Sequence, residues 1–214
     1  MKIAIITNYW KNSDGGGVKT YVVNLVDALK NKGSDVNLLF REGDDAEQFF
    51  GGMNKMLFSM NCYRYLRKIH PDVVHTQGTW YCLLPGVLFK KIHGCTLVHT
   101  FHSEPVKSLS LPSKIFVQNL LNGCNCITFV SKNLLEKEIE IDGFSFSCTE
   151  ITHGGVSSQV VSDEEVERFN EQYGIDKNSN ILLAQAMTAH PLKAEGLKLL
   201  IKSISLLNES HQLC

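Results

Sequence analysis

Short apolar runs alternate with helical patterns along most of the chain, and this alternation limits the fold more than any single motif. The runs have the length of strands, and several are almost continuously apolar, as expected of strands buried on both faces of a sheet. They span residues 2–7, 35–40, 72–76, 96–102, 126–130 and 146–152. A regular strand–helix alternation predicts an α/β fold with a doubly wound, Rossmann-like parallel sheet and right-handed crossovers.

The segments between these strands have helical periodicity. An apolar stripe with i, i+3, i+4, i+7 spacing predicts the first helix, which ends before Gly33: Val18, Tyr21, Val22, Leu25, Val26 and Leu29. Further helices are predicted over residues 53–69, 82–92, 113–122 and 132–140, the last with Ser131 as its N-cap. We expect the methionines of the 53–69 helix to pack in the core. Peripheral membrane contact is the alternative, because residues 49–70 carry both aromatic and basic side chains.

The pattern restarts near residues 155–163. A loop is followed by a capping box from Ser162 to Glu165, and then by a strand over 180–186 and a helix over 197–207. We therefore predict a Rossmann-like domain over residues 1–160. Residues 161–214 are predicted to form a linker helix and the first strand and helix of an incomplete second α/β unit. Such a unit would pack on the first domain, meet a partner chain or be truncated.

Composition excludes several classes of function. The net charge of −1 comes with dispersed lysines and arginines, so nucleic acid is not an expected partner. No apolar run approaches the roughly 18 residues that would span a bilayer. The seven cysteines include no C-x-x-C pair, which argues against a zinc site and a disulfide framework and favours a reduced, cytoplasmic protein.

Candidate ligand-binding residues follow the predicted strands, because open parallel sheets bind ligands beyond the carboxyl ends of their strands. Gly15, Gly16 and Gly17 precede the first helix, where backbone N–H groups and the helix dipole favour an anion. Their spacing is not that of a dinucleotide fingerprint, so a ligand loop and a flexible turn both remain open. His102 ends the fourth strand and is placed to hydrogen-bond a substrate hydroxyl or to transfer a proton; a histidine satisfied by the backbone is the alternative.

Other polar residues are weaker candidates. Glu104 follows His102 as either a cleft carboxylate or a surface one, and Ser131 follows the fifth strand at the same edge. Lys193 opens the last helical pattern and either binds phosphate or is solvated. His75 and His99 lie within strands and are predicted to be satisfied core histidines, and no histidine spacing indicates a metal.

Taken in order, six segments resemble the retaining glycosyltransferases of the GT-B fold, glycosyltransferase family 4. Five match the family's N-terminal domain: "GGGVKTYVVNLVDALKNKGSDVNLL", "PDVVHTQG", "TLVHTFHSE", "CITFVSKNLLEKE" and "ITHGGVSSQVV". The sixth, "YGIDKNSNILLAQAMTAHPLKAEGLKLLIKSISLL", resembles the opening of its nucleotide-binding domain. The resemblance implies transfer of a sugar from a nucleotide-sugar to a glycan, lipid or small-molecule acceptor with retention, and it implies neither a metal nor a cofactor.

The resemblance also implies roles for individual residues. The three glycines would lie over the donor diphosphate or the acceptor, His102 would contact the transferred sugar, and Lys193 would neutralise the leaving diphosphate. The family's Gly-Arg after the first strand of the second domain is absent, and His153 stands where the family turn has asparagine. Because the rest of a donor domain is also missing, we expect a part that needs a complementary half or a second copy. A non-catalytic binding module is the alternative, and a sugar-nucleotide epimerase of the same fold is a third.

Overall fold

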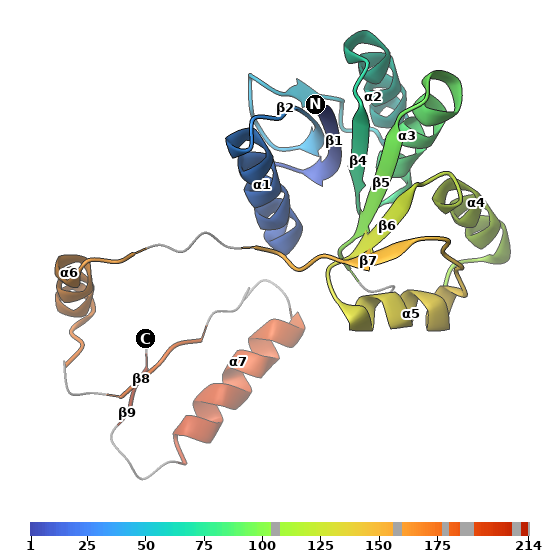
Figure 1. Cartoon of the computed structure of the whole chain (residues 1–214). Helices are drawn as coiled ribbons and strands as arrows, with labels where there is room; N and C mark the ends of the chain where they lie inside the picture. The colour runs from blue at the N-terminus through green and yellow to red at the C-terminus, as the bar shows by residue number, and fades with distance from the viewer. Residues whose placement is uncertain (104–107, 156–159, 177–179, 185–190, 207–210, 214) are drawn as a thin grey trace. The chain divides into compact units, whose positions relative to one another are not determined.

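The computed structural model describes residues 1–103, 108–155, 160–176, 180–184, 191–206 and 211–213 (Figure 1). The chain forms two compact units, Met1–Ser157 and Ser158–Cys214, which are described separately below. The boundary expected from the sequence, after residue 160, stays a prediction. Within the described residues, no helix is both long and apolar enough to cross a bilayer.

Unit 1 is built on a seven-stranded sheet in the order β3-β2-β1-β4-β5-β6-β7, and every neighbouring pair is parallel. The strand order reverses between β1 and β4, which is the point where doubly wound sheets leave room for a ligand. The prediction of a doubly wound parallel sheet is therefore confirmed. The strands are β1 (Lys2–Tyr9), β2 (Asp35–Glu42), β3 (Phe49–Phe50), β4 (Val73–Gln77), β5 (Thr96–Phe101), β6 (Cys126–Phe129) and β7 (Thr149–Ile151).

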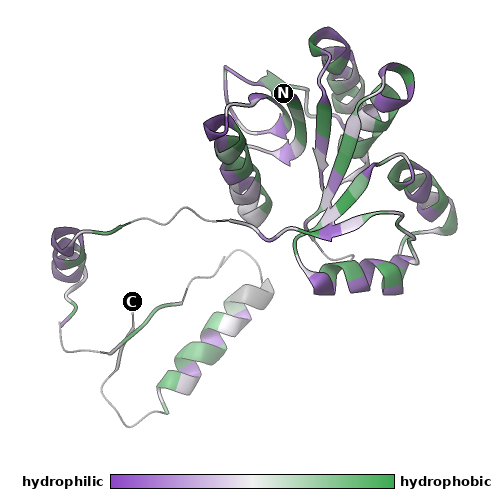
Figure 2. Ribbon diagram, in the orientation of Figure 1, coloured by the Kyte–Doolittle hydropathy of each residue, from purple (hydrophilic) through white to green (hydrophobic). Residues whose placement is uncertain are grey.

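Helices cover both faces of this sheet, because alternate side chains of each strand point to opposite faces. Ile3 and Ile5 of β1 pack in a cluster with Val22 and Val26 of the first helix, whereas Ala4 and Ile6 belong to the larger cluster on the other face. Figure 2 shows the strands as predominantly hydrophobic ribbons between helices with mixed surfaces. The helices are α1 (Gly16–Asn31), α2 (Lys55–Ile69), α3 (Trp80–His93), α4 (Leu111–Leu121) and α5 (Lys132–Asp142).

The expectation that the methionines of α2 pack in the core is wrong. The core contacts of α2 come from Phe58, Cys62 and Leu66, which follow each other at i, i+4 spacing and are fully buried. Met56 and Met60 lie off this stripe and are 60% and 43% exposed. The buried face of α2 is thus narrower than the count of its apolar residues suggests.

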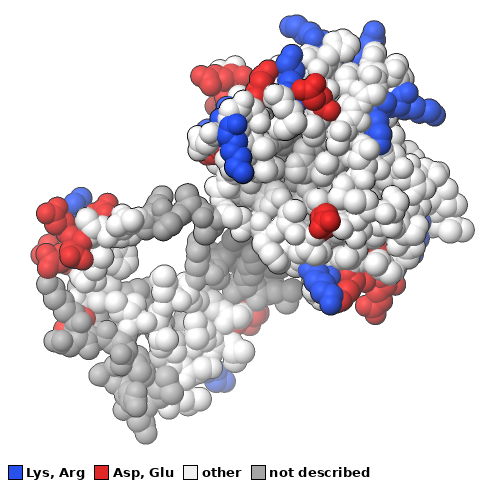
Figure 3. All heavy atoms as spheres, viewed as in Figure 1, with Lys and Arg blue, Asp and Glu red and all other residues white. Residues whose placement is uncertain are grey.

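Basic side chains gather over the ends of α2 and α3, at the top of the face shown in Figure 3. The last turns of these helices carry Arg67, Lys68, Lys90 and Lys91. Cations there complement the negative ends of the helix dipoles. Both helices run antiparallel to the strands, so this positive surface lies at the edge of the sheet opposite the strand carboxyl ends.

Unit 2 contains α6 (Asp163–Tyr173), β8 (Asn180–Leu182), α7 (Pro191–Ile204) and β9 (His211–Leu213). The predicted capping box is present, since the Ser162 side chain accepts from the Glu165 N–H while the Glu165 carboxylate accepts from the Ser162 N–H. The last helix begins at Pro191, earlier than the predicted residue 197, and proline suits a first helical position. β8 and β9, which precede and follow α7 in the chain, form a parallel pair. The sequence analysis predicts no strand at the position of β9.

Candidate functional site

A pocket of about 490 Å³ lies beside α1 at the carboxyl edge of the sheet. This is the edge where ligands bind in open parallel sheets, and the volume falls in the range of roughly 300–1,000 Å³ typical of small-molecule sites. Segments after β5, β6 and β7 complete its wall. The lining residues are Gly17, Val18, Thr20, Tyr21, Asn24, His102, Val130, Gly154 and Gly155.

The glycine triplet forms the N-terminus of α1 rather than a loop in front of it. Gly15 is the N-cap, and α1 begins at Gly16, whose φ of 53° lies in the left-handed region. A Cβ at Gly15 would lie 2.3 Å from the Cβ of Tyr9, whereas a Cβ at Gly17 would meet nothing within 4 Å. The first N–H groups of a helix have no intrahelical acceptor and carry the positive end of the dipole. The pocket therefore has the positive end of a helix dipole on one side.

His102 reaches the pocket from the end of β5. Its Nε2 lies 2.5 Å from Oε1 of Gln77, and its ring meets the ring of Tyr21 edge-on at 4.8 Å. Burial lowers the pKa of His102 to about 4, so the imidazole is neutral at pH 7. With Oε1 of Gln77 as an acceptor, Nε2 carries the proton and Nδ1 is an acceptor. His102 can thus hydrogen-bond a ligand hydroxyl without bringing a positive charge.

Gln77 is a polar residue that the sequence reading did not single out. It ends β4 with 1% of its surface exposed, and its Nε2 has no hydrogen-bond partner among the described residues. An unpaired buried amide donor is costly unless something occupies it. Its place at the end of a strand, in "HTQGTW", is the signal that the sequence offers.

Hydrogen bonds between distant segments hold the two walls of the pocket together. Asn24 of α1 donates to the carbonyl of Gly155 at 2.7 Å, and the Tyr21 hydroxyl lies 3.3 Å from Oγ1 of Thr152. Both pairs are 131 residues apart in sequence. Gly17, Tyr21 and Asn24 follow i, i+4, i+7 spacing and so share one face of α1. That spacing is present in the sequence, but Tyr21 fits the apolar stripe of the first helix equally well.

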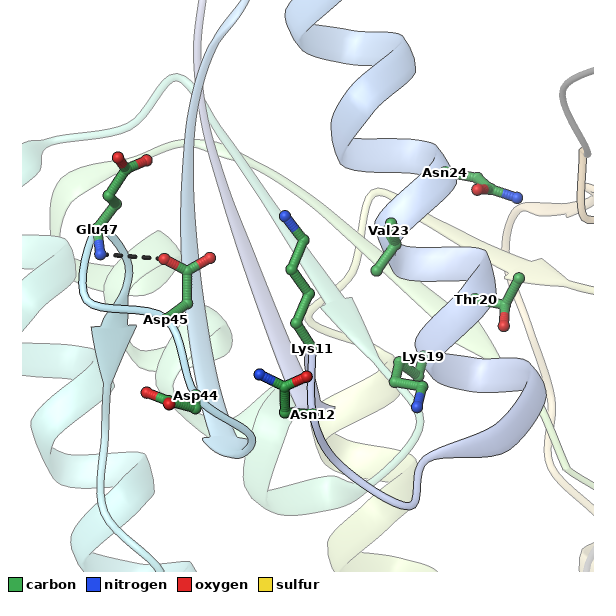
Figure 4. Close-up of a pocket in the computed structure, with 9 residues that line it drawn as sticks. All are labelled: Lys11, Asn12, Lys19, Thr20, Val23, Asn24, Asp44, Asp45 and Glu47. Atoms are coloured by element: carbon green, nitrogen blue, oxygen red, sulfur yellow. Dashed lines mark hydrogen bonds between the residues drawn. The ribbon is translucent and has the colours of Figure 1, made fainter.

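A second hollow of about 680 Å³ lies between α1 and the segment after β2 (Figure 4). Thr20 and Asn24 line both hollows, so α1 forms a shared wall. Asp45 accepts from Nε1 of Trp10 at 2.7 Å, and this bond holds the pKa of the Asp45 carboxyl below its usual value. Lys11 and the acidic residues around it give this hollow mixed charge, and it contains neither His102 nor the glycines.

A family model described as Glycosyltransferase Family 4 matches residues 15–160, which is more than half of the chain. The chain belongs to glycosyltransferase family 4. The match begins at the glycine triplet and ends where the predicted first domain ends. A comparison with curated proteins finds no match.

Three solved structures illustrate the similarity in fold, and each is less than 20% identical in sequence to this chain. A glycosyltransferase from Rickettsia africae ESF-5 is similar at 17% identity with a TM-score of 0.71, over all of this chain and 68% of that one. HepE from Anabaena, solved with UDP and glucose, is similar at 13% identity with a TM-score of 0.61, over all of this chain and 68% of HepE. MurG from Acinetobacter baumannii is similar at 15% identity with a TM-score of 0.58, over all of this chain and 60% of MurG. At these identities the likeness establishes the fold.

The family 4 chain brings together only some of the residues expected at its site. Gly17 and His102 line one pocket, with Gly15 and Gly16 beside it in the same helix end. Ser131 caps α5, where its Oγ accepts from the Leu134 N–H at 3.2 Å, as predicted, and it is not among the pocket-lining residues.

The two remaining candidates fall outside what the structure describes. Glu104 lies in the segment 104–107, which is outside the described residues. Lys193 lies in the first turn of α7, in unit 2, and its side chain is not described. Within the described residues, no group of three or more His, Cys, Asp or Glu side chains is arranged to hold a metal ion.

The prediction that His75 and His99 are satisfied core histidines is confirmed for His99, which is 1% exposed, whereas His75 has a hydrogen-bond partner but is only partly buried. Nδ1 of His99 lies 2.7 Å from Oγ1 of Thr76, and Nε2 of His75 lies 2.7 Å from Oγ1 of Thr100. Burial, reinforced by neighbouring histidines, lowers the pKa of His99 to about 3 and that of His75 to about 4. Both rings are neutral structural groups next to the site.

Acidification is expected to destabilise unit 1 in the window from pH 6.5 down to about 3. In the unfolded chain these histidines take up protons near pH 6.5, but the folded rings resist protonation, so stability is full above pH 6.5 and falls as the pH drops. Each unit of pKa difference corresponds to about 1.4 kcal/mol. Urea unfolding followed by tryptophan fluorescence at several pH values measures the effect, and His99→Leu should flatten it while His93→Leu, at an exposed site, should not. A wild-type stability that is constant from pH 7 to 4 would contradict this assignment.

Proposed function

We propose that this chain forms the acceptor-side part of a retaining glycosyltransferase that takes its sugar from a nucleotide-sugar donor. Membership of family 4 supports glycosyl transfer as the reaction class. The observation that carries the proposal is that Gly17, at the N-terminus of α1, and the neutral His102 line the same pocket. A diphosphate leaving group and a sugar hydroxyl are the two chemical features that such a pocket recognises.

Each candidate residue has a role in this proposal. The N–H groups at Gly16 and Gly17 face the donor diphosphate or the acceptor, stabilised by the dipole of α1. The imidazole of His102 hydrogen-bonds the transferred sugar, and the leaving phosphate rather than a protein carboxylate assists deprotonation of the acceptor. Lys193 neutralises the leaving diphosphate, and Glu104 and Ser131 contribute to donor or acceptor binding. The proposal requires no metal or cofactor.

The proposal includes a second polypeptide, which completes the donor site. The chain spans 60% of the length of MurG and 68% of the other two solved relatives, so the activity of a whole enzyme is carried over here only as a proposal. We propose that a complementary chain or a second copy supplies the rest of the nucleotide site. Alone, the chain should then bind the donor weakly.

Isothermal titration with UDP-glucose, GDP-mannose and ADP-glucose tests the proposal, with the chain alone and with a candidate complementary chain. The expected result is weak binding of one donor alone, and at least about tenfold tighter binding with release of the nucleoside diphosphate in the complete assembly. Glycan binding without any nucleotide-sugar turnover, even after complementation, would contradict sugar transfer and favour the binding module.

Peripheral membrane contact from a cytoplasmic location is a further part of the proposal. Apolar side chains at and before the first half of α2 are exposed, and the exposed Lys55 lies among them. These apolar residues are Phe50, Met53, Met56, Leu57 and Met60. Apolar groups interleaved with a cation suit an anionic lipid surface. Co-sedimentation of the protein with vesicles that contain phosphatidylglycerol should decrease after Met56→Ser and Met60→Ser. Unchanged co-sedimentation would contradict membrane contact through this surface.

A further inference from the structure

A third hollow, of about 630 Å³, lies under α4 on the side of the sheet opposite α1. It shares no lining residue with the pocket that contains His102. Its walls come from the ends of β4 and β5 and from α3, α4, α5 and the segments next to them. The apolar part of the lining consists of Trp80, Leu83, Phe101, Leu109, Phe116, Val117, Leu121 and Phe144.

One carboxyl group in this apolar lining is not explained by the fold. Glu138 is 4% exposed, and no described residue forms a hydrogen bond or an ion pair with its carboxyl group. A carboxyl group buried without a partner is destabilising, and a leucine at this position of α5 would continue the apolar wall. Burial, together with the nearby Asp142, raises the pKa of Glu138 to about 7.

The second acid of the pocket does have structural partners, which makes the contrast informative. Asp142 accepts the N–H of Leu109 at 2.8 Å, and Nζ of Lys114 lies 3.7 Å from its Oδ1. Asp142 and Lys114 therefore compensate each other, and Glu138 is the group left over. The other titratable residue of the lining, His99, is kept neutral by burial.

Part of the apolar wall of this pocket is exposed to solvent. Leu109 and Phe116 line it and are still 38% and 44% exposed, so part of the wall faces water. Ile115, next to Phe116 on α4, is also exposed. The ring of Trp80 contacts that of Phe116 edge-on at 5.7 Å inside the same wall. Exposed apolar groups around a pocket are typical of a site for a hydrophobic ligand.

We propose that this pocket binds an amphiphilic primary amine, with the hydrocarbon part against the aromatic and aliphatic wall and the ammonium group on Glu138. An ammonium group supplies both the hydrogen-bond donor and the positive charge that Glu138 lacks. The site goes beyond the proposed sugar transfer and does not depend on it. Binding converts Glu138 to its ionised form, so the affinity for the amine increases with pH up to about 7 and levels off above it.

Fluorescence of Trp80 provides the test with the whole chain and three probes of equal chain length: octylamine, octanol and octanoate. The expected result is saturable binding of octylamine, at least about tenfold tighter than octanoate at pH 7.5. Trp80→Phe identifies the signal, because Trp10, the other tryptophan of the sequence, does not line the pocket. Octanoate binding as tightly as octylamine would overturn the proposal.

Three variants distinguish an effect on ligand binding from an effect on the fold. Glu138→Gln keeps the shape of the side chain and should weaken octylamine binding at least about tenfold, with octanol binding unchanged. Glu140→Gln, at an exposed position of the same helix, is the matched control and should bind as wild type does. Ser113→Phe fills the pocket from α4 and should abolish binding of all the probes. Unchanged octylamine affinity in Glu138→Gln, or in Ser113→Phe, would contradict the site.

Discussion

Replacing His102 with alanine is expected to reduce the rate of sugar transfer by at least about 100-fold in the complete assembly. The variant loses the hydrogen bond to the transferred sugar and leaves the buried Gln77 with both polar atoms unpaired. Because burial lowers the pKa of His102 to about 4, protonation of this histidine should not change the wild-type rate between pH 8 and 5, and the rate should fall toward pH 4. Release of the nucleoside diphosphate at saturating donor gives kcat, and varying the donor gives KM.

The matched control is His93→Ala, which makes the same chemical change at an exposed residue at the end of α3. It should leave kcat within about twofold of wild type. A rise in KM of the His102 variant with unchanged kcat would mean that the imidazole binds substrate and transition state equally. A variant with wild-type kcat and KM would remove His102 from the site altogether.

The order of strands and helices could be predicted because it rests on periodicity. The continuous apolar run from Ile3 to Ile6 marks β1, and Ser131 and Ser162 mark helix starts by capping chemistry that acts within one turn. The two-residue β3 has no period to detect. The exposure of Met56 and Met60 depends on which stripe of α2 meets the sheet, and composition does not determine that.

The candidate site could be predicted only where a residue follows a strand directly. His102 and the glycines were found in this way, since the carboxyl ends of parallel strands meet at one edge. Tyr21 and Asn24 were missed because their roles come from contacts with Thr152 and Gly155, 131 residues away. Glu138 could not be predicted because an acidic residue on an amphipathic helix is usually exposed, and its burial among residues from several elements is a property of the tertiary structure.

The same substitution, glycine to alanine, is expected to have opposite effects at two positions of the glycine triplet. Gly15→Ala places a Cβ 2.3 Å from Cβ and 2.6 Å from Cγ of Tyr9. The Cβ of Tyr9 is bonded directly to the backbone and cannot rotate away, so the end of β1 and the start of α1 must separate. We expect a loss of about 1–3 kcal/mol of stability, together with weaker ligand binding in the pocket beside α1.

Gly17→Ala is the matched control, because a Cβ there meets no atom within 4 Å and its φ is not in the left-handed region. It should raise stability by about 0.5–1 kcal/mol, the gain of replacing glycine with alanine inside a helix. Urea unfolding followed by tryptophan fluorescence measures both variants, and both tryptophans, Trp10 and Trp80, lie in unit 1. Equal stability of the two variants would contradict the close approach of Gly15 to Tyr9. The expected difference would instead establish that Gly15 is required for packing, which leaves Gly17 as the glycine of the triplet that is free to face a ligand.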